Sequence, residues 1–152
     1  MSVTARLAEL GITIPQVAKP VASYVPATTT GNLVFTAGQL PFVDGQLPAT
    51  GKVGDEVSAE DAKDLARIAV LNAIAAVETA IGSVDRVTRI VKLVVFVAST
   101  PGFTGHPAVA NGASDTLVDI FGDAGRHARS AVGVAALPLD APVELELVVE
   151  FA

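Results

Sequence analysis

The feature that most constrains the fold is an alternation of apolar and charged residues near the end of the chain, in residues 143–151 (VELELVVEF). Successive side chains of a β-strand point to opposite faces, so this pattern predicts a strand with one buried face. A small, mostly apolar stretch, residues 129–136, precedes it, and Pro138 and Pro142 interrupt the chain between the two. We therefore expect two strands that meet across a proline-bounded loop.

Arg129 stands at the start of the first of these strands, whose continuation is small and apolar. One interpretation is a structural ion pair with Glu144 or Glu146 on the neighbouring strand. The other is that the planar guanidinium binds the carboxylate of a ligand through two parallel hydrogen bonds, which lysine cannot reproduce. The strand pattern alone leaves both interpretations open.

Periodicity and capping signals predict the other elements. Helices are expected over residues 2–10, 58–81 and 106–121, each followed by glycine. Residues 21–25 and 33–40 predict a hairpin around a turn at 28–32. Residues 84–98 predict a long strand, and their continuous apolar run, residues 93–97, predicts a central strand that is covered on both faces. This order indicates an α+β domain, with two helices packed on one sheet, that spans residues 1–152.

Composition narrows the function classes. Hydrophobic residues make up 51% of the chain, yet no apolar run approaches the ~18 residues of a membrane span, so we expect oligomerisation and no membrane partner. The formal charge of −6 argues against nucleic acid as a partner. Cysteine is absent, and the N-terminus lacks a secretory pattern, which favours a cytoplasmic protein. His106 and His127 have no clustered ligand residues around them, so we expect no metal site.

Five residues remain as candidates for chemistry. Glycine within a strand indicates close approach of another group, which singles out Gly38. The only tyrosine lies in the predicted hairpin, where its ordinary role is packing with an exposed hydroxyl. The full set comprises Tyr24, Gly38, Asn111, Arg129 and Glu144.

Four separated motifs contain or flank these residues: residues 31–41 (GNLVFTAGQLP), Asn111 on a helix, residues 127–132 (HARSAV) and residues 137–146 (LPLDAPVELE). In this order they resemble the RidA (YjgF, reactive intermediate deaminase) family over residues 20–152, and residues 1–20 are similar to an N-terminal extension of a longer branch. The resemblance implies a chorismate-mutase-like α+β fold with a mixed sheet, and a barrel-like homotrimer with clefts between subunits. It also implies hydrolysis of enamines and imines such as 2-aminoacrylate to 2-keto acids and ammonia, without a metal or other cofactor.

By this resemblance, Arg129 would hold the carboxylate of a small enamine, imine or 2-keto acid, and Glu144 would position or activate the attacking water. Gly38 would offer backbone groups, and Tyr24 and Asn111 would shape the cleft. This chemistry suits the composition, because an imine is already electrophilic and needs orientation and proton transfer rather than a strong nucleophile.

The sequence departs from the family pattern at three positions. Ala37 stands where well-studied members have Ser or Thr, Ala131 where they have Cys, and Gly133 where an acidic residue is common. Each change removes a polar contact, so a non-catalytic binder of small carboxylates, or a regulatory protein, is the alternative function. A ribonuclease label also occurs in the family, but the acidic charge and the lack of a suitable histidine pair count against it.

Overall fold

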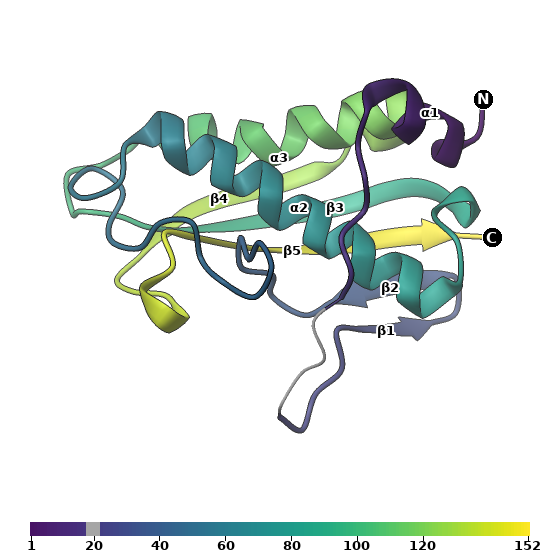
Figure 1. Ribbon diagram of the computed structural model, residues 1–152, viewed down its shortest axis with the longest axis horizontal. Coiled ribbons are helices and arrows are strands. Elements are labelled where there is room, and N and C mark those ends of the chain that lie inside the picture. Colours follow the sequence, from purple (N-terminus) through teal and green to yellow (C-terminus); the bar gives the residue numbers. More distant parts are fainter. Residues whose placement is uncertain (18–21) are drawn as a thin grey trace.

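The computed structural model describes residues 1–17 and 22–152. In this part of the chain, a five-stranded sheet is covered on one face by two long helices (Figure 1). The elements are α1 (Val3–Leu10), β1 (Ala27–Thr30), β2 (Leu33–Thr36), α2 (Ala59–Ile81), β3 (Val87–Ala98), α3 (His106–Phe121), β4 (Ala128–Val134) and β5 (Val143–Phe151). Short 3-10 helices cover Val84–Arg86, Gly122–Gly125 and Pro138–Asp140.

The strand order is β1-β2-β5-β3-β4, with β3 and β4 parallel and the other neighbours antiparallel. The predicted α+β class with a mixed sheet is therefore confirmed. The expectation that β4 and β5 would lie side by side is wrong, because β3 lies between them. A parallel pair needs a crossover connection, and α3 supplies it between β3 and β4.

The helix boundaries agree with the capping signals. The hydroxyl groups of Ser2 and Ser58 accept hydrogen bonds from the first turns of α1 and α2, and Gly11 and Gly82 end these helices in the left-handed region. The predicted strand over residues 21–25 is wrong: Val21 lies outside the described residues, and residues 22–25 form no strand. The hairpin instead pairs β1 with β2 around a tight turn at residues 31–32, because Pro26 cannot donate to a sheet ladder and the threonines after it can.

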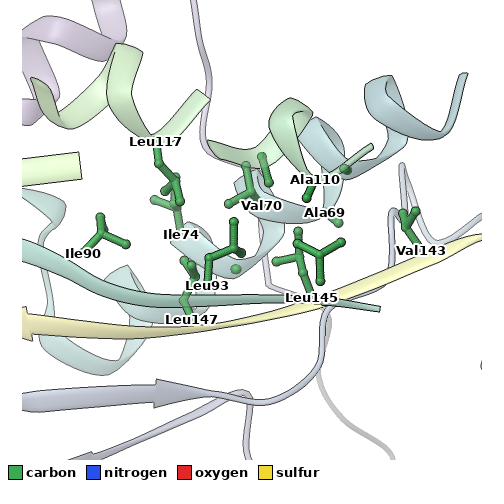
Figure 2. Packing of buried hydrophobic residues seen from close by; sticks show 14 of the residues in the cluster. Ala69, Val70, Ile74, Ile90, Leu93, Ala110, Leu117, Val143, Leu145 and Leu147 are labelled. Atoms are coloured by element: carbon green, nitrogen blue, oxygen red, sulfur yellow. The ribbon is translucent and has the colours of Figure 1, made fainter. Parts of the chain in front are cut away.

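The core lies between the sheet and the helices α2 and α3 (Figure 2). Alternate residues of β3 and β5 point into it, so that Leu93, Leu145 and Leu147 are fully buried opposite Ile74 of α2 and Leu117 of α3. These alternating residues and the alanine-rich stripe of α2 confirm the periodicities on which the fold was predicted.

Within residues 1–17 and 22–152, no helix lies over the other face of the sheet (Figure 1). Val94 and Phe96 of β3 are only half-buried there, and Phe35 and Val132 are 41% and 46% exposed. The prediction that β3 is covered on both faces is therefore wrong within one chain. A sheet face with this many exposed apolar groups is typical of an interface.

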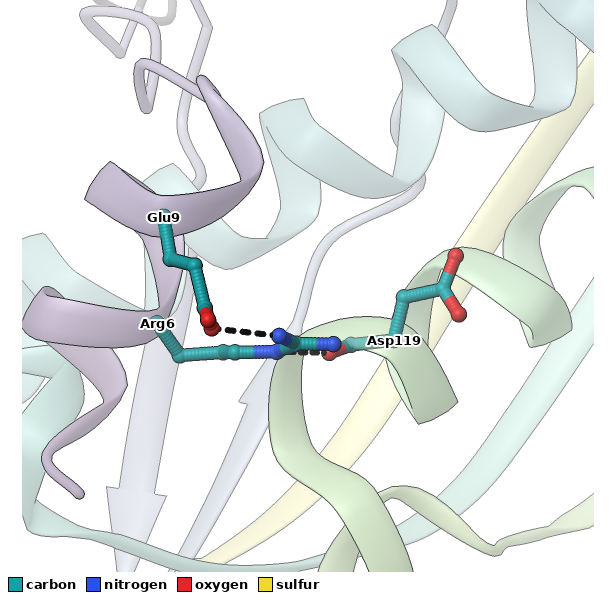
Figure 3. A network of polar contacts seen from close by, with 3 residues as sticks. All are labelled: Arg6, Glu9 and Asp119. Carbon is teal, nitrogen blue, oxygen red and sulfur yellow. Dashed lines mark hydrogen bonds and ion pairs between the residues drawn. The ribbon is translucent and has the colours of Figure 1, made fainter.

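The N-terminal helix α1 is attached to the end of α3. Arg6 lies between Glu9, to which it is ion-paired, and the carbonyl oxygen of Asp119, which accepts a bond of 2.9 Å from Arg6 Nε (Figure 3). At the other end of α1, the backbone and hydroxyl of Thr4 donate to the carboxylate of Asp85. These two bonds lower the pKa of Asp85. Among the described residues, no helix combines the length and apolar character needed to cross a membrane.

Candidate functional site

The guanidinium of Arg129 is held by two polar side chains of α3. Its Nη1 donates to Asn111 Oδ1 at 2.7 Å and to Ser114 Oγ at 3.1 Å. Asn111 and Ser114 are three residues apart and therefore share one face of the helix. Arg129 pairs in register with Leu93, whose side chain is in the core, so Arg129 projects from the helix-covered face of the sheet.

His127 extends this network at the start of β4. Its Nε2 lies 2.9 Å from Ser114 Oγ, and its Nδ1 lies 2.6 Å from the carbonyl oxygen of Gly125. Arg129, Asn111, Ser114 and His127 are all half-buried. We call these four residues the arginine cluster.

No carboxylate of residues 1–17 or 22–152 forms an ion pair with Arg129. The predicted structural alternative, a pair with Glu144 or Glu146, is wrong within one chain because β3 separates β4 from β5. Both oxygens that hold the guanidinium are neutral, and within the described residues Nη2 and Nε have no hydrogen-bond partner. The arginine cluster therefore retains a full positive charge and three free N–H donors.

A second group of residues forms where the pairing of β2 with β5 is interrupted. The regular ladder ends at Phe35, and Gln39 then makes an isolated bridge to Leu145 through bonds of 2.7 and 3.0 Å. In the gap between them, the hydroxyl of Thr36 accepts from the backbone N–H of Leu147 at 3.0 Å, where a regular ladder would use a carbonyl group. The chain at residues 37–38 is thereby freed from pairing with β5.

Glu144 lies over the freed segment. A Cβ atom at Gly38 would overlap Glu144 Oε1 and would lie 2.9 Å from Glu144 Cδ. The close approach predicted at Gly38 therefore exists, and the group that approaches is the side chain of Glu144. We call Gly38 and Glu144 the glutamate cluster.

Glu144 is half-buried, and its carboxylate has no hydrogen-bond donor among residues 1–17 and 22–152. Burial raises the pKa of Glu144, and the nearby carboxylate of Glu146 raises it further. Both effects disfavour the charged form, so this carboxyl group is better suited to accept and return a proton than an ordinary surface glutamate.

The two clusters lie on opposite faces of the sheet. Glu144 pairs in register with Phe96 on the open face, whereas Arg129 pairs with Leu93 on the helix-covered face. The structure thus brings Asn111 to Arg129 and Gly38 to Glu144, but it does not bring the two pairs together. Tyr24 joins neither pair through a hydrogen bond; it is 58% exposed in the segment before β1.

Sequence reasoning did not identify Ser114 and His127 as site residues. The spacing from Asn111 to Ser114 is one helical turn, which was a usable signal for Ser114. No periodicity indicates His127, because its contact depends on the bend that leads from the 3-10 helix into β4. In the described residues, no group of three or more His, Cys, Asp or Glu side chains is placed to hold a metal ion.

Gly133, one of the three departures from the family pattern, lies close to two polar side chains. A Cβ at Gly133 would lie 2.6 Å from His106 Nε2 and 2.9 Å from Ser99 Oγ, so glycine leaves room for this second serine–histidine pair. Ser99 Oγ and His106 Nε2 are 3.1 Å apart. The pair lies against Gly133 near the carboxyl end of β4, at the opposite end of the strand from the arginine cluster.

Comparisons with known proteins agree with this architecture. The model of a family described as "YjgF/chorismate mutase-like, putative endoribonuclease" matches residues 4–152. Protein TCP17 of Trypanosoma cruzi is 44% identical over 149 residues, which cover 97% of this chain and 93% of that protein. A crystal structure of a "putative endoribonuclease" from Shewanella oneidensis superposes with a TM-score of 0.95 at 32% identity, covering 99% of this chain and 100% of that one. The structure of Escherichia coli TdcF with bound serine has a TM-score of 0.67 at 29% identity and covers 90% and 94% of the two chains.

Proposed function

Because this chain belongs to the YjgF/chorismate mutase-like family, we propose that it hydrolyses small enamines and imines that bear a carboxylate, such as 2-aminoacrylate, to 2-keto acids and ammonia. One observation carries the proposal: Arg129 is half-buried and fixed by two neutral oxygens, with no carboxylate of the described chain paired to it. Desolvated arginine with free donors is suited to bidentate binding of a carboxylate ligand. The bound serine of TdcF, an amino acid with a carboxylate, supports this ligand class.

Glu144 supplies the proton transfer in this proposal. An enamine such as 2-aminoacrylate first tautomerises to the imine, as a proton moves from the nitrogen to the methylene carbon. Water then attacks the imine carbon, and one of its protons passes through Glu144 to the nitrogen, which gives a carbinolamine. Glu144 next carries the hydroxyl proton of the carbinolamine to the nitrogen, so that the carbon–nitrogen bond breaks, the carbonyl group forms and ammonia leaves. The raised pKa of Glu144 brings it nearer to the pH at which a general base can both take and return the proton.

A small 2-imino acid cannot contact both clusters of one chain, because they lie on opposite faces of the sheet. The proposed site therefore combines Arg129 and Asn111 of one subunit with Gly38 and Glu144 of the next, in a homotrimer. The exposed apolar face of the sheet supports assembly. Light scattering should give the mass of three chains at micromolar concentration, and a monomer would contradict both the assembly and the shared site.

The direct test is keto-acid release from freshly generated 2-aminoacrylate, compared with the spontaneous reaction in buffer. The expected result is faster pyruvate formation with the wild type and a loss of the acceleration with Arg129→Ala. Thr36→Ser lies outside both clusters and keeps the hydroxyl group that accepts from Leu147. It therefore controls for effects of preparing a variant protein. No acceleration by wild type would contradict catalysis.

Assays of the same wild-type and variant proteins can distinguish two other functions. A non-catalytic carboxylate binder, which the alanines at positions 37 and 131 favour, would bind pyruvate but would not accelerate its formation. The family description favours an endoribonuclease. RNA cleavage that remains proportional to protein through further purification and is lost with Glu144→Gln would support that function over ours.

A further inference from the structure

We propose that Ser114 and His127 are positioning residues that determine which edge of the Arg129 guanidinium faces the ligand. The proposal rests on the function proposed above, because it concerns how the same arginine receives a carboxylate. It is drawn from the geometry of the arginine cluster, in which one hydroxyl group stands between a histidine ring and a guanidinium.

The hydrogen-bond directions in this cluster follow from the donors and acceptors available. The carbonyl oxygen of Gly125 can only accept, so the Nδ1 of His127, 2.6 Å away, carries a proton. In the neutral ring, Nε2 is then an acceptor, and the hydroxyl of Ser114 donates to it at 2.9 Å. The lone pairs of Ser114 Oγ are left to accept from Arg129 Nη1 at 3.1 Å. His127 therefore orients the serine hydroxyl as an acceptor.

This orientation leaves one edge of the guanidinium for the ligand. Nη1 has two N–H groups, and Asn111 Oδ1 and Ser114 Oγ take one each. The remaining donors are the two of Nη2 and the one of Nε. The Nε–H group and one N–H group of Nη2 are parallel and form one edge with the spacing of a carboxylate. Ser114 thus prevents rotation of the Arg129 guanidinium, and the ligand carboxylate meets a pair of N–H donors that is already aligned.

Ser114→Ala should weaken pyruvate binding by roughly 3- to 10-fold, because one of the two hydrogen bonds that hold the guanidinium in place is lost. Ser114→Thr keeps a hydroxyl group at the same position and should retain most of the affinity. His127→Asn keeps a donor for Gly125 but is too short to reach Ser114, whereas His127→Gln can place an acceptor near the position of Nε2. We therefore expect a larger loss of affinity with His127→Asn than with His127→Gln.

The matched control is Ser99→Ala. It removes the other serine–histidine hydrogen bond of the chain described here, between Ser99 and His106, which lies at the far end of β4. A general effect of losing such a bond would appear in both alanine variants, but an effect through Arg129 would appear only with Ser114→Ala. Thermal unfolding of each variant shows whether its fold is intact.

The experiment is calorimetric titration of pyruvate into the full-length wild type and these five variants, with nitrogen NMR of His127 in wild type and Ser114→Ala. The expected result is an Nδ1-protonated ring whose Nε2 signal moves when Ser114 is replaced, together with the affinity order given above. Equal affinity of Ser114→Ala and wild type, or equal losses with Ser99→Ala, would overturn this inference alone. If the wild type does not bind pyruvate, the carboxylate function fails and this inference fails with it.

Discussion

The arginine cluster and the glutamate cluster hold side chains of opposite charge in different surroundings. In the first, a cation is surrounded by neutral oxygens and keeps three donors free. In the second, a carboxylate lies half-buried over a glycine without a donor, and a second carboxylate is nearby. Each cluster holds a charge that its own surroundings do not compensate, and the sheet separates the two within one chain.

Under the proposed function, this difference means that neither cluster is sufficient for the reaction. In that function, the arginine cluster would bind and orient a carboxylate, but both ring nitrogens of its histidine are engaged with Ser114 and Gly125. The glutamate cluster would supply a base, but it has no group to hold an anionic substrate beside it. Two uncompensated charges of opposite sign on different surfaces are complementary when a second copy of the chain is docked.

The sharpest test is complementation between two inactive variants. Trimers that contain both Arg129→Ala and Glu144→Gln subunits, isolated through a different tag on each, have one site of three with both native groups. They should therefore regain about one third of wild-type keto-acid release. Pure trimers of either variant should remain inactive. If the mixed trimers are as inactive as the pure ones, both groups act from the same chain.

Glu144→Gln tests the glutamate cluster alone. The amide keeps the shape of the side chain but cannot accept the proton of water, so turnover should fall by ~100-fold or more while pyruvate affinity changes little. Steady-state kinetics and calorimetry separate the two quantities. Equal losses of rate and affinity would make Glu144 a binding partner of the arginine rather than a base.

Arg129→Ala tests the arginine cluster. Loss of a charge-assisted, bidentate contact should weaken pyruvate binding by at least ~10-fold. Arg129→Lys should give intermediate affinity because it restores the charge without the fork. Since the partners of Arg129 in the described chain are neutral, we expect the thermal midpoint and the oligomer to change little. Unchanged affinity with a collapsed midpoint would refute the ligand role.

The smallest expected effect is on stability as a function of pH. Folding raises the pKa of Glu144, so the folded state is penalised as pH rises through the window from the ordinary glutamate pKa to the raised one. Glu144→Gln removes this penalty. The variant should melt above wild type at about pH 7, and the difference should disappear at about pH 4. This prediction holds for a shared site in which the substrate lies between Glu144 and the Arg129 guanidinium of the next subunit. A variant that melts below wild type at about pH 7 would instead show that the two groups form a direct ion pair in the empty site.

Local signals predicted most of the fold. Ser58 and Gly82 fixed the ends of the longest helix, and the alternation in residues 143–151 correctly indicated which face of β5 is buried. The pairing of strands could not be predicted in the same way. The sequences of β4 and β5 do not indicate that β3 lies between them, because the order of strands in a sheet depends on contacts between residues that are distant in the sequence.

The candidate site shows the same limit. The sequence indicates Asn111 and Arg129 independently of each other, and the structure shows them in contact. The family resemblance implies one site for Glu144 and Arg129, yet the register of β3 with its two neighbours places them on opposite faces of the sheet. The alternation of side chains shows which residues of one strand share a face. Whether residues of β4 and β5 share a face depends on how each strand pairs with β3, and this register cannot be read from the alternation.

The hydroxyl of Thr36 has a consequence for redesign of this scaffold. Because it accepts the backbone N–H of Leu147, β5 stays satisfied without help from the main chain at residues 37–38. An engineer who wishes to change the surroundings of Glu144 should therefore leave Thr36 and Gly38 untouched, because the first keeps β5 satisfied and the second leaves room for the Glu144 side chain.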